Sequence, residues 1–320
     1  MRGLVGFLLF RVLSASVTLL GLTLVVFTAM HLIPGDFTEV LVPRGTPEFR
    51  KALAERLGLD GPLYWQYLTW LKNLVSGDFG ASLITSQPVW KEFAGRLPVT
   101  MELAVLSVAT SIAIGAPLGL ISGLAGTGRF VSAISRVFCG FTVSLPDFFL
   151  GTIFLYVFSK YALGLTVGDF VPLSVNPEAH FRGMALPVLS LSLLGIGTVA
   201  AVTRETVFTL SDQDYVFAAT VRGRSMSQIV RRHFVRNASV PLLTVISIYL
   251  GYLLGGSILI EQLFSLPGIG RYIFQAVQAR DYPVVQAGVV MIAAAFVLTN
   301  MLTDIAYGVI DPRMRAGHEH

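Results

Sequence analysis

Residues 241–263 read PLLTVISIYLGYLLGGSILIEQL, an apolar run whose only carboxylate, Glu261, comes close to its end. A helix needs roughly 20 mostly apolar residues to cross about 30 Å of hydrocarbon, and this run is long enough. Hydrophobic residues make up 54% of the chain and charged residues only 13%, which is too apolar for a soluble domain of this length. The sequence predicts an all-α integral membrane protein with six transmembrane helices, the other five at 10–30, 100–123, 134–159, 184–207 and 284–309.

Basic residues gather on one side of these predicted spans. If the N-terminus is inside, the short outer loops carry only Lys160, Arg182, Arg271 and Arg280. The inner side then collects Arg2, Arg11, Arg129, Arg136, Arg204, Arg222, Arg224, Arg231, Arg232, Arg236, Arg313 and Arg315. Because basic residues beside span ends stay in the cytoplasm, both termini are predicted to be cytoplasmic. Topology thus accounts for the net charge of +4, and no nucleic-acid partner is needed.

The long segment at 32–99 carries basic and acidic residues in near balance, and we expect a small extracytoplasmic helical subdomain there. Thr46 and Gly58 bracket one predicted amphipathic helix, and Pro62 and Gly77 bracket a second. The first span follows a basic start but has no small-residue cleavage site, so we interpret it as a retained helix. The predicted organisation is an N-terminal span at 1–31, the subdomain at 32–99, a five-helix core at 100–310 with a cytoplasmic loop at 208–240, and a cytoplasmic tail at 311–320.

Motifs for catalysis are absent from the sequence. There is no phosphate-binding loop, HExxH or GxSxG pattern, and the two Gly-x-Gly pairs at 195–197 and 268–270 lack the strand-to-helix context of a dinucleotide site. Cys139 lies in an apolar run and is predicted to be an inert packed thiol. The two histidines of 318–320 are better explained by a frayed terminus than by a metal site. We therefore expect no enzyme activity, no metal and no cofactor in this chain.

Few ionisable side chains fall inside the predicted spans. Glu102, Glu261 and Asp304 lie near span ends, where we expect water or backbone amides to reach them. Asp147 directly follows Leu145 and Pro146, a helix-breaking pair that we expect to open onto a cavity. Ion-driven carriers use arrays of intramembrane carboxylates or histidines, so these sparse charges disfavour that class of transporter.

A polar, arginine-rich island separates the fourth and fifth spans. Residues 211–214 read Ser-Asp-Gln-Asp and predict N-capping oxygens and a first-turn acid. Residues 215–222 predict a short helix, with Gly223 as its C-terminal stop. A second helix is expected to begin at Ser225 and run towards the next span. From the residues alone, a compact helical hairpin with a binding role and an ordinary basic loop are equally good interpretations.

The island resembles the cytoplasmic loop of permease subunits of binding-protein-dependent ATP-binding-cassette importers, in particular the dipeptide, oligopeptide and nickel group. That group has Asp-Tyr-x-x-x-Ala-x-x-x-Gly and then His-x-x-x-Asn-Ala, matched here by Asp214, Tyr215, Ala219, Gly223, His233, Asn237 and Ala238. Further stretches resemble the group in the same order along the chain, at 31–36, 77–80, 100–103, 264–271, 280–286 and 311–313. Phe217 stands where the broader importer pattern has Glu, so a salt bridge of that Glu does not carry over.

The resemblance implies the type I permease fold and alternating access in the bacterial inner membrane. The implied partners are a second homologous permease, two ATP-binding subunits that hold ATP and magnesium, and an extracytoplasmic substrate-binding protein. The residues expected to couple this chain to an ATP-binding subunit are Asp214, Tyr215, Phe217, Ala218, Ala219, Arg222, Gly223 and Arg224. Those expected to support the loop are His233, Arg236, Asn237 and Pro241.

Pathway or outer-gate residues are expected in three places. The small residues Gly251, Gly255 and Gly256 permit close helix contact at a pore or dimer face, although tight internal packing explains them equally well. The helix-breaking segment with Pro267, Gly268 and Gly270 is expected at the outer mouth, and Asp147 lies within a span. For the substrate, short peptides are our first prediction and nickel or a metal chelate the second. An ion-driven carrier is the alternative of a different class.

Overall fold

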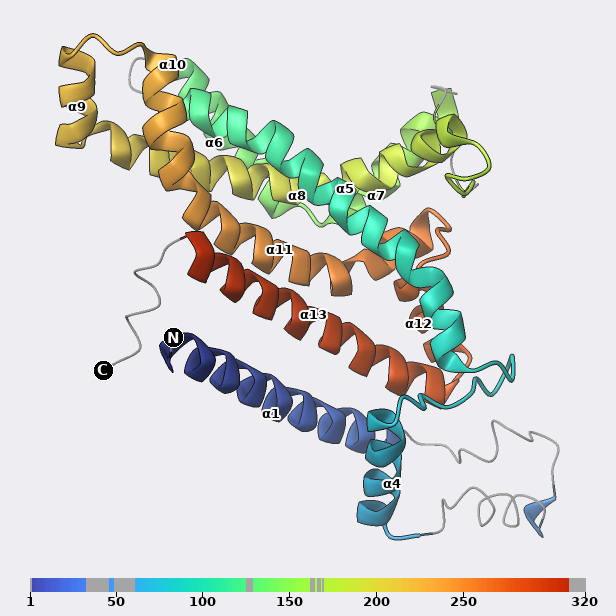
Figure 1. The fold of residues 1–320 in the computed structure, drawn as a ribbon. Helices are drawn as coiled ribbons and strands as arrows, with labels where there is room; N and C mark the ends of the chain where they lie inside the picture. The colour runs from blue at the N-terminus through green and yellow to red at the C-terminus, as the bar shows by residue number, and fades with distance from the viewer. Residues whose placement is uncertain are drawn as a thin grey trace. The chain divides into compact units, whose positions relative to one another are not determined.

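The computed structural model of the chain describes residues 2–32, 46–48, 61–124, 129–161, 165, 168 and 170–310. Within these residues the protein is helical, and its one β-type feature is an isolated antiparallel bridge between Ala81 and Pro88. The chain divides into two compact units, Met1–Pro98 with Arg271–Val297, and Val99–Gly270 with Leu298–His320. Figure 1 shows their helices as ribbons.

In the described part of the chain, five helices are long and apolar enough to cross a membrane. Their spanning stretches are Leu9–Leu32, Val89–Gly123, Pro177–Ser211, Asn237–Leu263 and Tyr282–Ile305. The predicted third span is different, because it is broken. Helix α6 (Arg129–Ser144) and helix α7 (Asp147–Tyr161) are bent by 98° at Leu145 and Pro146. The bent pair makes six spans if it is counted as one.

The first unit contains helix α1 (Arg2–Leu32) and helix α4 (Leu63–Val75). They meet through aromatic rings, since Phe27 lies 5.4 Å from Tyr67 and 5.9 Å from Trp70 between ring centroids. The predicted amphipathic helix between Pro62 and Gly77 is confirmed. The predicted helix between Thr46 and Gly58 lies outside the described residues except for 46–48, and the tail at 311–320 also lies outside them.

The second unit is built around helix α8 (Pro177–Ser211), which contacts α6, α7 and helix α11 (Val235–Leu263). Helix α5 (Val89–Gly123) brings three glycines against the α8 backbone. A Cβ at Gly119 would lie 2.5 Å from the carbonyl oxygen of Ala200, and Gly115 and Gly123 are similarly close to Ile196 and Arg204. Small residues at this spacing let two helices approach closely.

The segment between the last two spans is more ordered than the sequence indicated. The predicted breaks are present, but they flank a helix, α12 (Ile269–Gln278), which is followed by α13 (Tyr282–Ile310). Helix α12 buries Ile269, Tyr272, Ile273 and Ala276. This spacing is that of one helical face, so α12 is amphipathic rather than irregular.

Candidate functional site

The arginine-rich island folds into a small helical hairpin, called here the α9 hairpin and defined as residues 212–237. Helix α9 (Asp214–Val221) is followed by a single turn, α10 (Met226–Ile229), by a π-helical turn η1 (Val230–Phe234) and by α11. The second helix predicted from Ser225 is therefore present and continues without interruption into the membrane span. In Figure 1 the hairpin lies at one end of the long helices α8 and α11.

The end of α9 is fixed by Gly223, as the sequence predicts. Gly223 has a φ of +73°, and its N–H donates to the carbonyl of Thr220 at 2.9 Å. The N–H of Arg224 donates to the carbonyl of Ala219 at 3.2 Å. These are the two hydrogen bonds of a Schellman motif, which needs a left-handed residue at this position. The predicted N-cap is wrong, because the N-cap residue is Gln213 and its side chain makes no capping bond.

One face of α9 is buried against the rest of the hairpin. Val216 and Ala219 join a cluster with Val207 from α8, Ile229 from α10 and Phe234 from η1. Val207, Ile229 and Phe234 are each 1% exposed. The sequence placed Ala219 beside Phe217 on one contact surface, but the structure places Ala219 in this cluster. Ala219 therefore supports the hairpin from inside.

The opposite face of α9 is exposed and partly apolar. Phe217 is 72% exposed and Val221 is 70% exposed, and they are neighbours on the helix surface because they are four residues apart. Asp214 is exposed on the same side, and Ala218 is half-buried. Val221 was not among the predicted coupling residues; its spacing from Phe217 was the signal that could have identified it. An exposed apolar pair away from the spans is a candidate contact for another protein.

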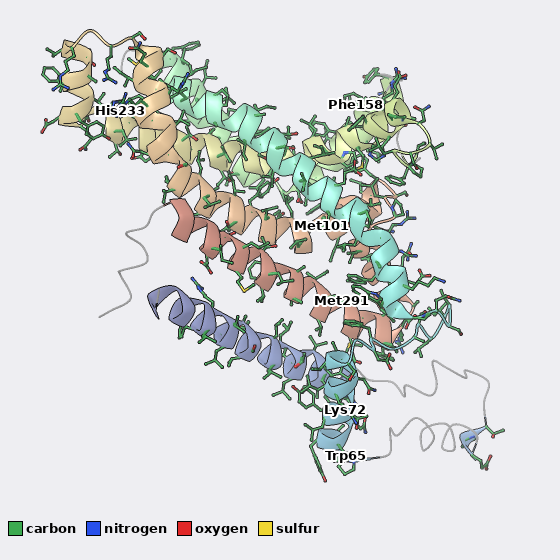
Figure 2. All side chains as sticks on the ribbon, viewed as in Figure 1. Trp65, Lys72, Met101, Phe158, His233 and Met291 are labelled. Carbon is green, nitrogen blue, oxygen red and sulfur yellow. The ribbon has the colours of Figure 1, made fainter. Side chains whose placement is uncertain are left out.

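Tyr215, His233 and Asn237, which belong to the motif shared with the importer permeases, come into contact between α9 and the following helix. The Tyr215 ring lies 5.4 Å from the His233 ring between centroids, and the amide nitrogen of Asn237 donates to the hydroxyl of Tyr215 at 3.4 Å. Figure 2 shows His233 on the side of its helix nearest α9. Tyr215 thereby joins α9 to η1 and α11, and His233 and Asn237 are the residues through which it does so.

The remaining predicted loop residues are placed as follows. Arg222 is exposed and Arg224 half-buried, so both lie at the rim of the hairpin. Pro241 lies inside α11 without breaking it. The backbone of Arg236 is in α11, and its side chain lies outside the described residues. The π turn at 230–234 carries Arg231, Arg232 and His233, and such turns are frequent at functional sites.

The predicted outer-gate segment is organised by a buried carboxylate. Glu261 is 0% exposed, and the Thr100 hydroxyl donates to its Oε1 at 2.7 Å. The N–H of Ile269, the first residue of α12, donates to the Thr100 oxygen at 2.9 Å. Gly268 lies so close to the Glu261 carboxylate that a Cβ there would collide with it. Of the two kinds of partner expected for Glu261, water and backbone amides, bulk water does not reach this buried carboxylate, and the hydroxyls of Thr100 and Ser257 donate to it.

Turn residues around this segment show how it is fixed. Ser265 has a φ of +56°, and the N–H of Leu266 donates to the carbonyl of Glu261 at 2.9 Å. This is again the long hydrogen bond of a Schellman motif, with serine where glycine is usual. Pro267 follows directly, and Gly270 packs against Ile258 of α11. Gly268 and Gly270 are thus required by close packing at the start of α12.

Two other carboxylates predicted in or near the spans, Glu102 and Asp147, have partners as well. Glu102 lies 2.7 Å from Nε2 of His180, whose Nδ1 lies 2.8 Å from the carbonyl oxygen of Val171. Asp147 accepts a hydrogen bond from the hydroxyl of Tyr252 at 2.9 Å. His180 and Tyr252 were not predicted, because no local sequence signal links them to Glu102 and Asp147. Asp304 lies near the end of the last spanning stretch, as expected.

Two glycines of α11 differ in their surroundings. A Cβ at Gly255 would meet nothing within 4 Å, whereas one at Gly256 would lie 3.0 Å from the ring of Tyr252 on the same helix. Internal packing, one of the two interpretations of these residues, therefore accounts for Gly256 but not for Gly255. Gly251 is half-buried.

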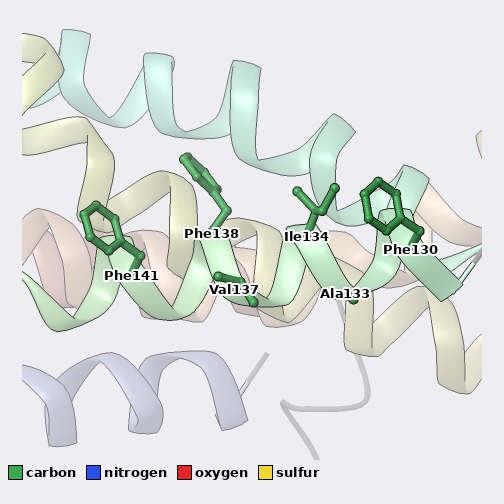
Figure 3. A pocket seen from close by; sticks show the side chains of 6 residues that line it. All are labelled: Phe130, Ala133, Ile134, Val137, Phe138 and Phe141. Atoms are coloured by element: carbon green, nitrogen blue, oxygen red, sulfur yellow. The ribbon is translucent and has the colours of Figure 1, made fainter.

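A hollow of about 460 Å³ lies on α6 and is wholly apolar (Figure 3). It offers no polar group that could orient a solute. Among the described residues no group of three or more His, Cys, Asp or Glu side chains could hold a metal ion. The stretch 318–320 lies outside them. Cys139 is buried, which agrees with the prediction of a packed thiol.

Comparisons with known proteins identify the class to which this architecture belongs. Residues 115–316 match the model of the binding-protein-dependent transport system inner membrane component, and residues 4–104 match its N-terminal companion model. The chain belongs to this family of membrane transport components.

Individual relatives align over nearly the whole chain. The sequence is 34% identical over 310 residues to a probable peptide ABC transporter permease of Sinorhizobium fredii, covering 97% of this chain and 99% of that protein. It is 34% identical over 324 residues to the dipeptide transport system permease DppB of Escherichia coli, covering 93% of this chain and 95% of that protein. A putative peptide transport system permease of Brucella abortus is 37% identical over 307 residues, covering 95% of this chain and 97% of that protein.

A solved structure supports the fold. An inward-facing conformation of the MetNI methionine ABC transporter superposes with a TM-score of 0.54 and 18% identity, covering 69% of this chain and 96% of the solved chain. The predicted permease fold is therefore confirmed. The chain is a multi-pass membrane protein, and the relatives that it matches are transport permease components.

Proposed function

We propose that this chain is a transmembrane permease subunit of an ATP-driven importer that moves short peptides across the bacterial inner membrane. The observation that carries the proposal is the end-to-end similarity to relatives described as peptide and dipeptide permeases. None of these names mentions nickel, and the family is defined by binding-protein-dependent transport. Peptides are therefore the substrate class we propose, in place of nickel or of an ion-driven carrier.

The importer has further subunits in this proposal. A second homologous permease completes the pathway, an extracytoplasmic binding protein delivers the peptide, and two ATP-binding subunits supply the energy. ATP and magnesium are bound by those subunits, since this chain has no phosphate-binding loop. In this proposal both termini and the α9 hairpin are on the cytoplasmic side, because arginine-rich short loops favour that side of the membrane.

The exposed face of α9 is the proposed contact with one ATP-binding subunit. Phe217 and Val221 project from it side by side, while Val216 and Ala219 hold the helix from behind. Large apolar side chains that fill a pocket on a partner carry most of the energy of an interface. Arg222 and Arg224 lie at the rim and serve orientation rather than affinity.

The test is to purify the complex of this chain with its partner permease, ATP-binding subunits and binding protein, and to change Phe217→Ser together with Val221→Ser. We expect fivefold or greater loss of ATP-binding subunits from the complex, since such contacts are worth about 1 kcal/mol or more each, and a parallel loss of peptide-stimulated ATP hydrolysis. The matched control is Val75→Ser at the end of α4, which is equally exposed and should change neither. Normal hydrolysis and uptake by the double variant would contradict the proposed contact, and failure of the unmodified complex to import peptides would contradict the proposed substrate.

A further inference from the structure

The break between α6 and α7 places irregular backbone between two apolar helices that have the combined composition of a membrane span or a re-entrant loop. The two helices meet at 98°, and the N–H groups of Phe149 and Leu150 turn back to the carbonyl of Pro146 at 3.1 and 3.2 Å. Irregular backbone at this depth is tolerated only where protein covers it or where it lines a water-filled cavity. In transporters such broken helices occur at solute sites.

A carboxylate lies directly at this break. Asp147 is 6% exposed, and its Oδ1 accepts the N–H of Phe148 at 2.7 Å. Its Oδ2 accepts the hydroxyl of Tyr252, which comes from α11. Among the ion pairs of the described residues, none involves Asp147. A carboxylate at this depth without a cation is costly to maintain, and such residues commonly mark solute pathways.

The partner of this carboxylate faces an open side of α11. Tyr252 is 42% exposed, and Gly255, almost one turn further along, leaves open space where a side chain would stand. Ile248 and Leu259 are exposed at the same helical spacing and extend the face in both directions. Because the Tyr252 hydroxyl donates its hydrogen bond to Asp147, the lone pairs of the phenol oxygen can accept a hydrogen bond from a donor on the exposed side of α11.

We propose that Asp147 and Tyr252 form a binding station within the membrane for the cationic group of the transported solute. Under the proposed function, on which this inference rests, that group is the α-ammonium of a short peptide. An ammonium has three hydrogen-bond donors and a positive charge. The station matches it with a phenol oxygen that can accept a hydrogen bond and with the negative charge of the buried Asp147 carboxylate behind it. The carboxylate is screened by Tyr252, which favours a weak contact that a moving solute can leave.

Position in the pathway is tested by photo-cross-linking in the complete importer. Ile248, an exposed neighbour of Tyr252 on the same face of α11, is replaced by p-benzoylphenylalanine so that Asp147 and Tyr252 stay intact, and radiolabelled trialanine is supplied during ATP-driven uptake. The control is the same replacement at Tyr156, an exposed tyrosine whose hydroxyl accepts a hydrogen bond from Lys160. Label is expected on position 248 and not on position 156. Absence of label at 248, while the unmodified complex imports trialanine, would overturn the inference and leave the proposed function standing.

The role of the charge is tested with Asp147→Asn, which keeps the shape of the side chain. We expect about a tenfold fall in trialanine moved per ATP hydrolysed, because a charge-assisted hydrogen bond is lost, while ATP hydrolysis stimulated by the loaded binding protein persists. Asp147→Glu should recover part of the yield, and Tyr156→Phe should leave it unchanged. An unchanged yield in Asp147→Asn would overturn the inference. Failure of that variant to assemble would also overturn it, since it would show that the carboxylate serves folding or assembly of the complex.

Discussion

Gly223 shows how much of the α9 hairpin depends on one backbone conformation. Its φ is positive, and yet a Cβ placed on it would meet nothing within 4 Å. The requirement for glycine is therefore conformational and not steric. The same left-handed position is occupied by Gly77 after α4, by Ser265 after α11 and by Arg280 after α12. The sequence signalled the two glycine stops, but Ser265 and Arg280 carry no such signal.

Replacing Gly223 separates backbone strain from crowding. Gly223→Ala should destabilise the hairpin by about 1 kcal/mol, because a left-handed conformation is unfavourable for residues with a Cβ. Gly223→Asn should cost clearly less, since asparagine tolerates this conformation. Hydrogen exchange of the α9 amides reports the difference, with roughly fivefold faster exchange expected for the alanine variant. Equal exchange in both variants would show that the Schellman motif does not limit opening of α9.

Long-range partnerships are the part of the site that sequence reasoning did not reach. Asp214, Tyr215 and Gly223 could be placed on or beside a short helix because propensity and capping act locally. The contact of Tyr215 with His233 and Asn237, and that of Asp147 with Tyr252, join segments that are distant in sequence. Burial of Ala219 rather than Ala218 likewise depends on which face of α9 meets Ile229 and Phe234.

At the level of helices, the prolines illustrate why it was difficult to predict whether a membrane span is one continuous helix or is broken. Pro187 and Pro241 lie inside α8 and α11, which remain continuous, whereas Pro146 coincides with a 98° bend. A proline inside a helix removes one helical hydrogen bond, as Pro187 and Pro241 do, whereas Pro146 directly precedes the first residue of α7, where no such bond is lost. The apolar run at 134–159 therefore had the composition of one span although it forms parts of two helices.

The contact of α5 with α8 gives a test at this scale. Gly119→Ala should destabilise the protein by about 1 to 3 kcal/mol, the range for overpacked interiors, because its Cβ would lie 2.5 Å from the Ala200 carbonyl oxygen. Gly140→Ala in α6 is the matched control, since a Cβ there meets nothing within 4 Å. Thermal unfolding midpoints in detergent provide the comparison. A similar midpoint for the two variants would contradict the close approach of these helices.

At the scale of the whole molecule, composition and span length predicted the fold class because lipid leaves few alternatives to helices. Family resemblance, carried by motifs distributed along the chain, added the permease architecture. What composition does not specify is the amphipathic helix α12 between the last two spans, whose apolar residues are too few and too widely spaced to register as a span. Orientation in the membrane follows from arginine placement and is directly measurable.

Topology can be tested by labelling single cysteines in a Cys139→Ala background. Phe217→Cys on α9 should react with a membrane-impermeant maleimide only from the cytoplasmic side, and Trp65→Cys on α4 only from the outside. Both parent residues are well exposed, whereas Cys139 is buried and should remain unlabelled in the unmodified chain. Labelling of both positions from the same side would refute the predicted topology.

The uninterrupted run from α10 through η1 to the end of α11 has a mechanical consequence. From Met226 to Leu263 a helical rod extends about 55 Å at 1.5 Å per residue. Tyr215 ties α9 to this rod near one end, and Glu261 secures the first residues of α12 near the other. No flexible loop separates the hairpin from this rod, so a movement of α9 is transmitted along it. A tilt of the rod by a few degrees would displace its end at Leu263 by several ångströms relative to the hairpin.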